Sequence, residues 1–135
     1  KICNAEFIEE NPNKTADFLL KLERLDDKWT NILDELKNSA DLNYTKLPYY
    51  FDTVAEQLLI YFTYRHLSGC LDDGRLSQRA NFIIFSYKTI ETLCKYHLSV
   101  NNNIEYNDIS EYARLYSSEI EYSEENIETI LKKFS

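Results

Sequence analysis

The chain of 135 residues is long enough for one domain with a single core, and its formal net charge of −8 disfavours a general nucleic-acid binder, because phosphate backbones attract positive surfaces. The same charge weakens binding to an anionic membrane, and no apolar run approaches the roughly 20 residues of a membrane span. A hydrophobic share of 44% with only 2 Gly and 2 Pro excludes a disordered tail and favours long helices over a sandwich or barrel.

The first helix is predicted to begin at Asn11-Pro12. Asparagine can cap a helix, and proline is tolerated in the first turn, where its missing N–H costs nothing. Apolar residues then recur at three- and four-residue steps from Phe18 to Leu36. We expect one amphipathic helix here, bent near Asp26-Asp27 and fading at Asn38-Ser39.

Two further helices are predicted after a connector at residues 40–48. Residues 51–66 carry an apolar side, and Ser68-Gly69 is the predicted stop, since glycine readily adopts the left-handed cap. Asp72-Asp73-Gly74 makes the next turn. Residues 76–98 are apolar almost all round, which predicts a central helix.

The C-terminal part is predicted to contain two shorter helices. A polar loop at residues 99–107 precedes a helix capped by Asp108 or Asn107, which breaks at Tyr122-Ser123. Ser123 followed by two glutamates has the form of a helix start, with a hydroxyl cap and acids in the first turn. The fold class is therefore all-α: residues 1–135 form a single-domain bundle of four to five helices.

The three cysteines, Cys3, Cys70 and Cys94, are widely spaced and match no zinc-site spacing, so no metal site is predicted. They are typical of reduced thiols in a cytoplasmic protein. Residues 1–30 lack the form of a signal peptide. The chain does not begin with Met, so we expect it to be part of a longer protein.

Candidate polar residues gather in YFTYRHLSGCLDDG, residues 61–74. Arg65 and His66 could provide a general base or a phosphate clamp, but neighbouring helical residues point about 100° apart. His66 lies on the apolar side of its helix, where a hydrogen bond inside the bundle is the alternative. Arg65 is predicted to pair with an acidic residue, with Asp72 or Asp73 as candidates.

The aspartates and tyrosines leave further alternatives open. Asp72 and Asp73 could bind a metal or a substrate's lysine ammonium, or could serve as turn-and-cap residues. Tyrosines around the second and third helices could form a peptide groove or an aromatic cage around an alkylated ammonium, or could be half-buried core. These tyrosines are Tyr44, Tyr49, Tyr50, Tyr61, Tyr64 and Tyr87. Catalytic residues stay unknown, and the candidate substrate-binding or structural cluster comprises Tyr61, Tyr64, Arg65, His66, Asp72 and Asp73.

Motifs for cofactor chemistry are missing from the sequence. It contains no Gly-rich phosphate loop, GxSxG, HExxH or GxGxxG pattern. A nucleotide cradle built of backbone N–H groups needs glycines, and this chain has two. No cofactor is therefore predicted to bind this chain by itself.

Three stretches resemble the flagellin lysine-N-methylase family. EQLLIYFTYRHLSGCLDDGRLSQRANFIIFSY (56–87) is similar to its helix with a "YF-x-YRH"-like motif, acidic-Gly turn and following apolar helix. ISEYARLYSSEIEYSEENIETILKKF (109–134) resembles the family's C-terminal ending with its "EIEHSEENL"-like motif, and LERLDDKW (22–29) fits the region before both. Tyr122 stands where the ending motif has histidine, which argues against proton transfer at that position.

The resemblance implies the C-terminal region of a bacterial enzyme that methylates lysines of flagellin with S-adenosylmethionine. A cysteine-rich motif for a metal or iron–sulfur centre is expected in the N-terminal part of such a protein. This chain would then be a helical domain that packs on that part and is inactive alone.

A stand-alone helical protein-interaction module is the alternative function. The missing cofactor motifs and the many tyrosines favour it. The reading frame upstream distinguishes the two: a cysteine-rich stretch in frame before Lys1 supports the enzyme, and a start codon just before it supports the module.

Overall fold

The structure, a computed structural model, describes residues 11–40, 42 and 45–135, and this part of the chain is helical without strands. The predicted all-α class is confirmed. The elements are α2 (Pro12–Leu20), α3 (Asp27–Lys37), α4 (Phe51–His66), η1 (Leu67–Gly69), α5 (Cys70–Asp73), α6 (Leu76–Asn101), α7 (Tyr106–Tyr116), η2 (Ser117–Glu121) and α8 (Glu124–Lys133). The described residues contain six helices of nine residues or more, so the predicted number of four to five is too low.

The number is higher because the first predicted helix is in fact two helices, α2 and α3. The Asn11 side chain accepts hydrogen bonds from two N–H groups of the first turn of α2, as predicted. The first helix ends at Leu20, ahead of the bend predicted near Asp26-Asp27, and at that bend Asp26 caps a new helix by accepting from the N–H of Lys28 at 2.8 Å. A cap at Asp26 gives α3 its own start, so α2 and α3 pack against each other as a helical pair.

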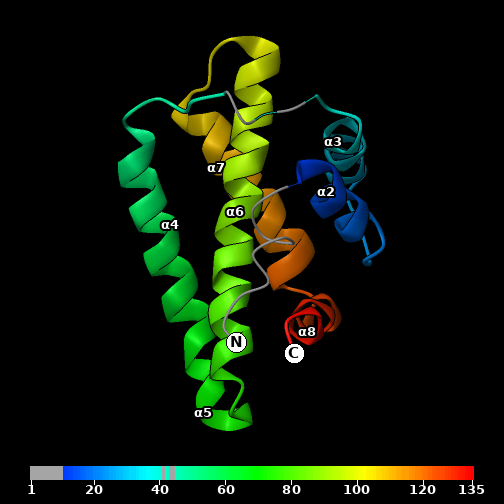
Figure 1. The fold of residues 1–135 in the computed structure, drawn as a ribbon, viewed down its shortest axis with the longest axis vertical. Coiled ribbons are helices and arrows are strands. Elements are labelled where there is room, and N and C mark those ends of the chain that lie inside the picture. Colours follow the sequence, from blue (N-terminus) through cyan, green and yellow to red (C-terminus); the bar gives the residue numbers. More distant parts are fainter. Residues whose placement is uncertain (1–10, 41, 43–44) are drawn as a thin grey trace.

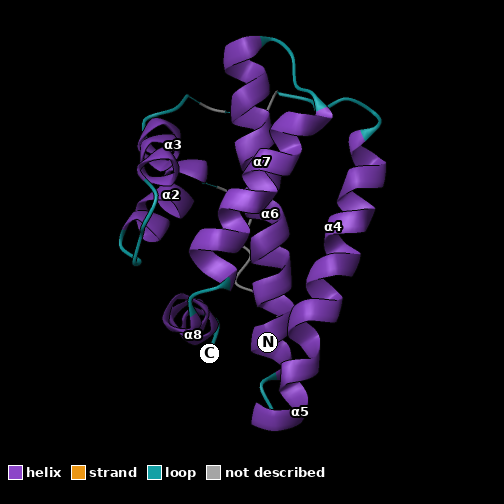
Figure 2. Cartoon of the chain, turned by 180° about the vertical axis from the view of Figure 1, so that it is seen from behind, coloured by secondary structure: helices purple, strands orange, loops and turns teal. Residues whose placement is uncertain are grey.

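Helix α6 is the centre of the fold, as its apolar sequence predicts. Figures 1 and 2 show α4 along one side of α6 and the α2–α3 pair on the other. Aromatic rings join the layers: Phe18 of α2 meets Phe85 of α6, and Trp29 of α3 meets Tyr116 of α7. Phe62 of α4 also packs edge-on against Tyr116, so α7 is in contact with both sides. Such edge-to-face pairs add to the burial that holds the bundle together.

Helix α4 ends at His66, close to the predicted stop, but the predicted left-handed cap at Gly69 is wrong. The chain passes Ser68-Gly69 as the short η1 and continues as α5 until Gly74, whose φ of +68° makes the predicted turn at Asp72-Asp73-Gly74. At Gly69 the backbone is approached closely, because a Cβ built there lies 2.3 Å from Cζ of Arg79, so any larger residue would displace this guanidinium. Glycine at 69 thus allows the Arg79 guanidinium to lie against the backbone, and glycine at 74 allows the turn.

Helix α7 begins earlier than predicted. Its N-cap is Glu105, and Asp108 occupies the third helical position, from which its carboxylate accepts the N–H of Glu105 at 2.8 Å. The predicted cap residue is therefore the other half of a capping box. The loop before α7 is shorter than the predicted 99–107, because α6 continues to Asn101 and ends where Asn102 adopts a φ of +60°.

The end of α7 passes into η2, a π-helical turn that stops at Tyr122, and Ser123 then caps α8 as predicted. Asn126 in the first turn of α8 is buried and reaches back to the segment between α2 and α3. Its amide nitrogen donates to the carbonyl oxygens of Glu23 (3.0 Å) and Glu119 (2.9 Å), and its oxygen accepts the N–H of Glu23 (3.2 Å). One side chain thus joins three separate segments.

Replacing this side chain tests the connection. Asn126→Ala leaves the backbone groups of Glu23 with no partner there, and we expect it to lower the free energy of unfolding by about 2 to 3 kcal/mol. Urea unfolding followed by circular dichroism measures the change. Asn38→Ala is the control, since the exposed Asn38 amide bonds only within its own turn, to the carbonyl of Asp34. Equal effects of the two variants would contradict the role given to Asn126.

Candidate functional site

Three of the predicted site residues meet at one buried carboxylate, Glu121 of η2. The Tyr61 hydroxyl donates to Oε1 of Glu121 at 3.0 Å, and His66 Nε2 hydrogen-bonds to Oε2. Nε of Arg65 lies 3.4 Å from the same Oε2. The side chain of Glu121 is 1% exposed, so these three groups of α4 replace the water it would otherwise bind. We call these four residues the Glu121 cluster.

The cluster keeps a charge inside the bundle. Burial raises the pKa of Glu121, but hydrogen bonds from His66 and Tyr61 and the charges of His66 and Arg65 outweigh it, so the pKa is lowered overall. An ionised carboxylate can only accept hydrogen bonds, so Nε2 of His66 must carry the hydrogen and donate it to Glu121. Burial and the nearby Glu121 charge raise the pKa of Tyr61, so its hydroxyl stays protonated at neutral pH.

The predicted bond of His66 inside the bundle is confirmed, as is the pairing of Arg65 with an acidic residue, but the candidate partners Asp72 and Asp73 are wrong. Arg65 pairs with Glu121, 56 positions along the chain, and its guanidinium lies over the ring of Tyr122, with Cζ 5.1 Å from the centroid. Neither Asp72 nor Asp73 takes this role, because helical conformation continues past Gly69 and carries them beyond α4. A cation over an aromatic face is favourable, so Tyr122 helps to hold Arg65 above the carboxylate.

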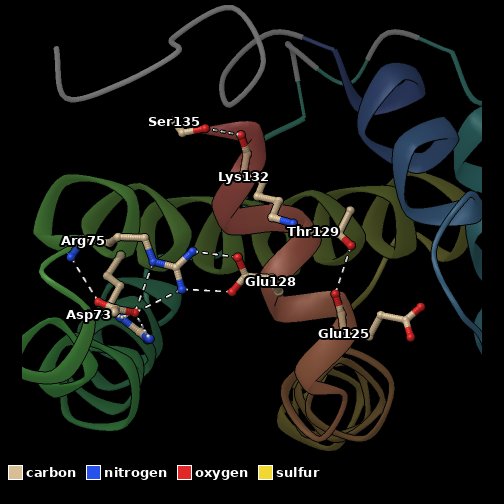
Figure 3. Close-up of polar contacts among 8 residues, drawn as sticks. Asp73, Arg75, Glu125, Glu128, Thr129, Lys132 and Ser135 are labelled. Carbon is tan, nitrogen blue, oxygen red and sulfur yellow. Dashed lines mark hydrogen bonds and ion pairs between the residues drawn. The ribbon is translucent and has the colours of Figure 1, made fainter.

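Asp73 belongs to a second polar cluster at the end of α5. Its carboxylate pairs with Arg75 (3.1 Å) and Arg79 (2.7 Å), and Arg75 also pairs with Glu128 of α8 at 2.8 Å. Figure 3 shows the Arg75 guanidinium between Asp73 and Glu128. Hydrogen bonds from Arg79 and from the backbone and side chain of Arg75 hold the pKa of Asp73 well below its usual range. We call Asp73, Arg75, Arg79 and Glu128 the Asp73 cluster.

The two clusters are connected through one arginine. Nη1 of Arg79 donates to the backbone carbonyl of His66 at 3.1 Å. The same guanidinium binds Asp73, so the turn after α4 is held against the start of α6. Tyr64 and Asp72 lie outside both clusters and are exposed.

The tyrosines predicted as a possible cage do not converge. The Tyr50 hydroxyl donates to the Ile104 carbonyl and that of Tyr87 to Glu91. Tyr49 and Tyr87 line one groove with residues of the connector, whereas Tyr64 lines another. Tyr44 lies outside the described residues. Tyr50 and Tyr87 are half-buried, as the core alternative predicts, whereas Tyr49 and Tyr64 are exposed and do not belong to the core.

The residues present do not fit a metal or iron–sulfur centre. Within residues 11–40, 42 and 45–135, no group of three or more His, Cys, Asp and Glu side chains is arranged to hold a metal ion. Cys94 is buried in α6, where burial raises the pKa of its thiol, and Cys70 lies in the separate helix α5. Cys3 is outside the described residues. Likewise, no described helix is both long and apolar enough to cross a membrane.

A protein-family model described as the FliB lysine N-methylase C-terminal domain matches residues 3–135. The chain belongs to this family. Searches of curated proteins and of solved structures find no match to it.

The fold gives the family resemblance a physical basis. The two stretches that carry it, 56–87 and 109–134, meet in the Glu121 cluster, because Tyr61, Arg65 and His66 come from the first and Glu121 from the second. The Asp73 cluster repeats this pattern, since Glu128 lies in the second stretch. Sequence reasoning missed Glu121, Arg75, Arg79 and Glu128. Glu121 belongs to the motif compared with the family, but a glutamate followed by Tyr122, Ser123 and two further glutamates gives no sign of its own burial, even though the preceding Ile120 is apolar and buried.

The charge on Glu121 makes stability depend on pH. A carboxyl with a lowered folded-state pKa stabilises the fold above the ordinary value of 4.5 and loses that contribution as the pH falls through its folded pKa. Glu121→Gln removes the charge and keeps the shape. At pH 7 we expect the variant to be less stable by about 2 kcal/mol. Urea unfolding from pH 7 downward should show this difference shrinking below pH 4.5.

The matched control is Glu111→Gln, because the pKa of Glu111 is lowered to about 2 by Arg114 and Lys28 at the surface. Screening by solvent makes such a pair weak, so the control should change stability little at any pH. A Glu121→Gln difference that stays constant from pH 7 to pH 3 would contradict an ionised Glu121 in the fold.

Proposed function

We propose that this chain is the helical C-terminal domain of a protein-lysine N-methyltransferase that methylates flagellin in the bacterial cytoplasm. The observation that carries the proposal is the family match over residues 3–135. S-adenosylmethionine and the metal or iron–sulfur centre implied by the family resemblance are assigned to the N-terminal part of the methylase. The partners of the domain are then that part and flagellin.

The domain has a structural role in this proposal, and the Glu121 and Asp73 clusters support it. Their charged groups bind one another across helices: Glu121 binds α4, and Arg75 connects Asp73 to α8. A lysine ammonium approaching Asp73 meets a carboxylate that two arginines already occupy. Both clusters therefore fix helices in place and leave substrate recognition to exposed groups.

The first test compares this chain with the longer methylase. Each is incubated with S-adenosylmethionine and purified flagellin, and methyl-lysine is measured by mass spectrometry. We expect methylation with the longer protein and none with the chain alone, because the described residues provide no arrangement for the metal centre. Turnover by the chain alone would contradict the assignment of catalysis to the N-terminal part.

The second test asks whether the clusters are structural or contact the substrate. In the longer methylase, Arg65→Ala and Asp73→Ala remove one member of each cluster. We expect both to lower the melting temperature and to leave kcat of the folded enzyme unchanged, because each side chain binds its own domain. Differential scanning fluorimetry and initial rates below the melting range measure the two effects. A lower kcat at unchanged melting temperature would make the affected residue a substrate contact.

A further inference from the structure

Helix α4 exposes several large apolar side chains, among polar ones, on the side that faces away from the bundle. Its inner side carries the buried Phe51, Val54, Phe62 and His66. Residues four apart share a face of a helix, and Ile60 and Tyr64 form such a pair on the outer side, with 51% and 83% of their surfaces exposed. The outer side of α4 therefore presents apolar side chains to solvent.

The exposed apolar side chains of α4 are unusual in comparison with the other helices of the bundle. The outer helices α3, α7 and α8 are amphipathic, with polar side chains toward solvent, whereas α6 lies in the centre and none of its residues 77–98 is exposed. Helix α4 has the weak amphipathicity of α6, yet it lies at the edge of the bundle in Figures 1 and 2. A helix with apolar side chains outside its buried stripe is normally covered there as well. The outer face of α4 is thus suited to a second packing partner.

The face has a shallow groove with a charge of its own. Asp52, Ala55, Glu56, Leu59, Ile60, Thr63 and Tyr64 line it. Two of these residues are acidic and none is basic, so a partner with apolar side chains flanked by lysine or arginine is complementary. A second copy of this chain fits poorly, because it would bring its own Asp52 and Glu56 and a net charge of −8 to the contact.

We propose that the outer face of α4, defined by the groove residues, is the docking surface for a basic, apolar surface of the N-terminal part of the methylase. This inference rests on the proposed function, which makes that part a permanent neighbour. A transient substrate would leave the apolar face exposed between turnovers, whereas a partner in the same polypeptide covers it at high effective concentration.

Cysteine labelling of the longer methylase tests the docking. Thr63→Cys places a thiol in the groove with little change in shape. Its matched control is Thr129→Cys on α8, because both threonines are exposed and donate to the carbonyl four residues earlier, Leu59 at 2.7 Å and Glu125 at 2.9 Å. Labelling requires a thiol that the reagent can reach. We expect maleimide to label Cys at 63 about tenfold more slowly in the longer monomeric protein than in this chain alone, and Cys at 129 at similar rates in both.

Peptide mapping separates the new thiols from Cys3, Cys70 and Cys94. Equal rates at position 63 in both proteins would overturn the proposal, as would equal slowing at both positions. The proposal would also be overturned if slow labelling at position 63 required added flagellin, or if labelling became slower at higher protein concentration, as expected for a dimer. Methylation of flagellin by the same sample separates the two hypotheses: an active enzyme with a freely labelled Cys at 63 refutes the docking alone.

A charge reversal tests the chemistry of the partner. Glu56→Lys changes the sign of one groove residue, and we expect it to return labelling of Cys at 63 in the longer protein to the rate of the isolated chain. Asp34→Lys is the control, since Asp34 is an exposed acid within α3, on the other side of α6 from α4 in both ribbon views. A basic partner predicts an effect of the first change only. Equal effects of the two changes would contradict charge complementarity at this face.

Discussion

Two buried carboxylates of the π-helical turn η2 determine how the helices around it are placed. Glu119 accepts the N–H groups of Leu25 (2.9 Å) and Asp26 (3.2 Å), whereas Glu121 accepts from α4. Both are buried, and a buried charge is costly unless several donors satisfy it. The two acids are two residues apart on a helical turn, so they point to nearly opposite sides. The start of α3 and the last turns of α4 are therefore fixed against the same short segment.

The conformation of η2 belongs to this arrangement. A π-helical turn inserts a residue relative to an α-helix and changes the direction of the side chains that follow it. Asn126 then binds the carbonyl of Glu119 and both backbone groups of Glu23, which holds the start of α8 against η2. Polar contacts with several donors allow one geometry, whereas the surrounding Leu and Ile side chains allow many. The apolar core supplies most of the driving force for folding, and these polar contacts fix how the helices are positioned relative to one another.

Features that depend on neighbouring residues could be predicted from the sequence. The Asn11 cap, the Ser123 cap and the central position of α6 follow from local side chains and from apolar periodicity. The break between α2 and α3 could not, because Glu119 stabilises the start of α3 from more than 90 positions away. The sequence SSEIEYSEEN has the composition of a solvated, acidic segment. Its burial depends on which donors the fold brings to it, and pattern rules do not contain that information.

The candidate site shows the same limit. The bond of His66 inside the bundle can be predicted from helical geometry alone, because His66 lies on the apolar side of its helix. Predicting the partner of Arg65 required the position of Asp73. That position depends on whether helical conformation ends at Gly69. The glycine serves the close approach of Arg79 instead, which places Asp73 with Arg75 and Arg79 and leaves Arg65 to Glu121 and Tyr122.

Helix α4 therefore has two faces with different requirements. The inner face ends in Tyr61, Arg65 and His66, and their common acceptor Glu121 fixes its rotation about its own axis. That rotation directs Ile60 and Tyr64 outward, since they lie on the opposite side of the helix. Phe51, Val54 and Phe62 are buried on the same inner side, so apolar burial and the Glu121 cluster select the same rotation. That rotation leaves Ile60 and Tyr64 in solvent, from which the domain by itself gains nothing, and this is the physical reason to regard the domain as one half of an interface.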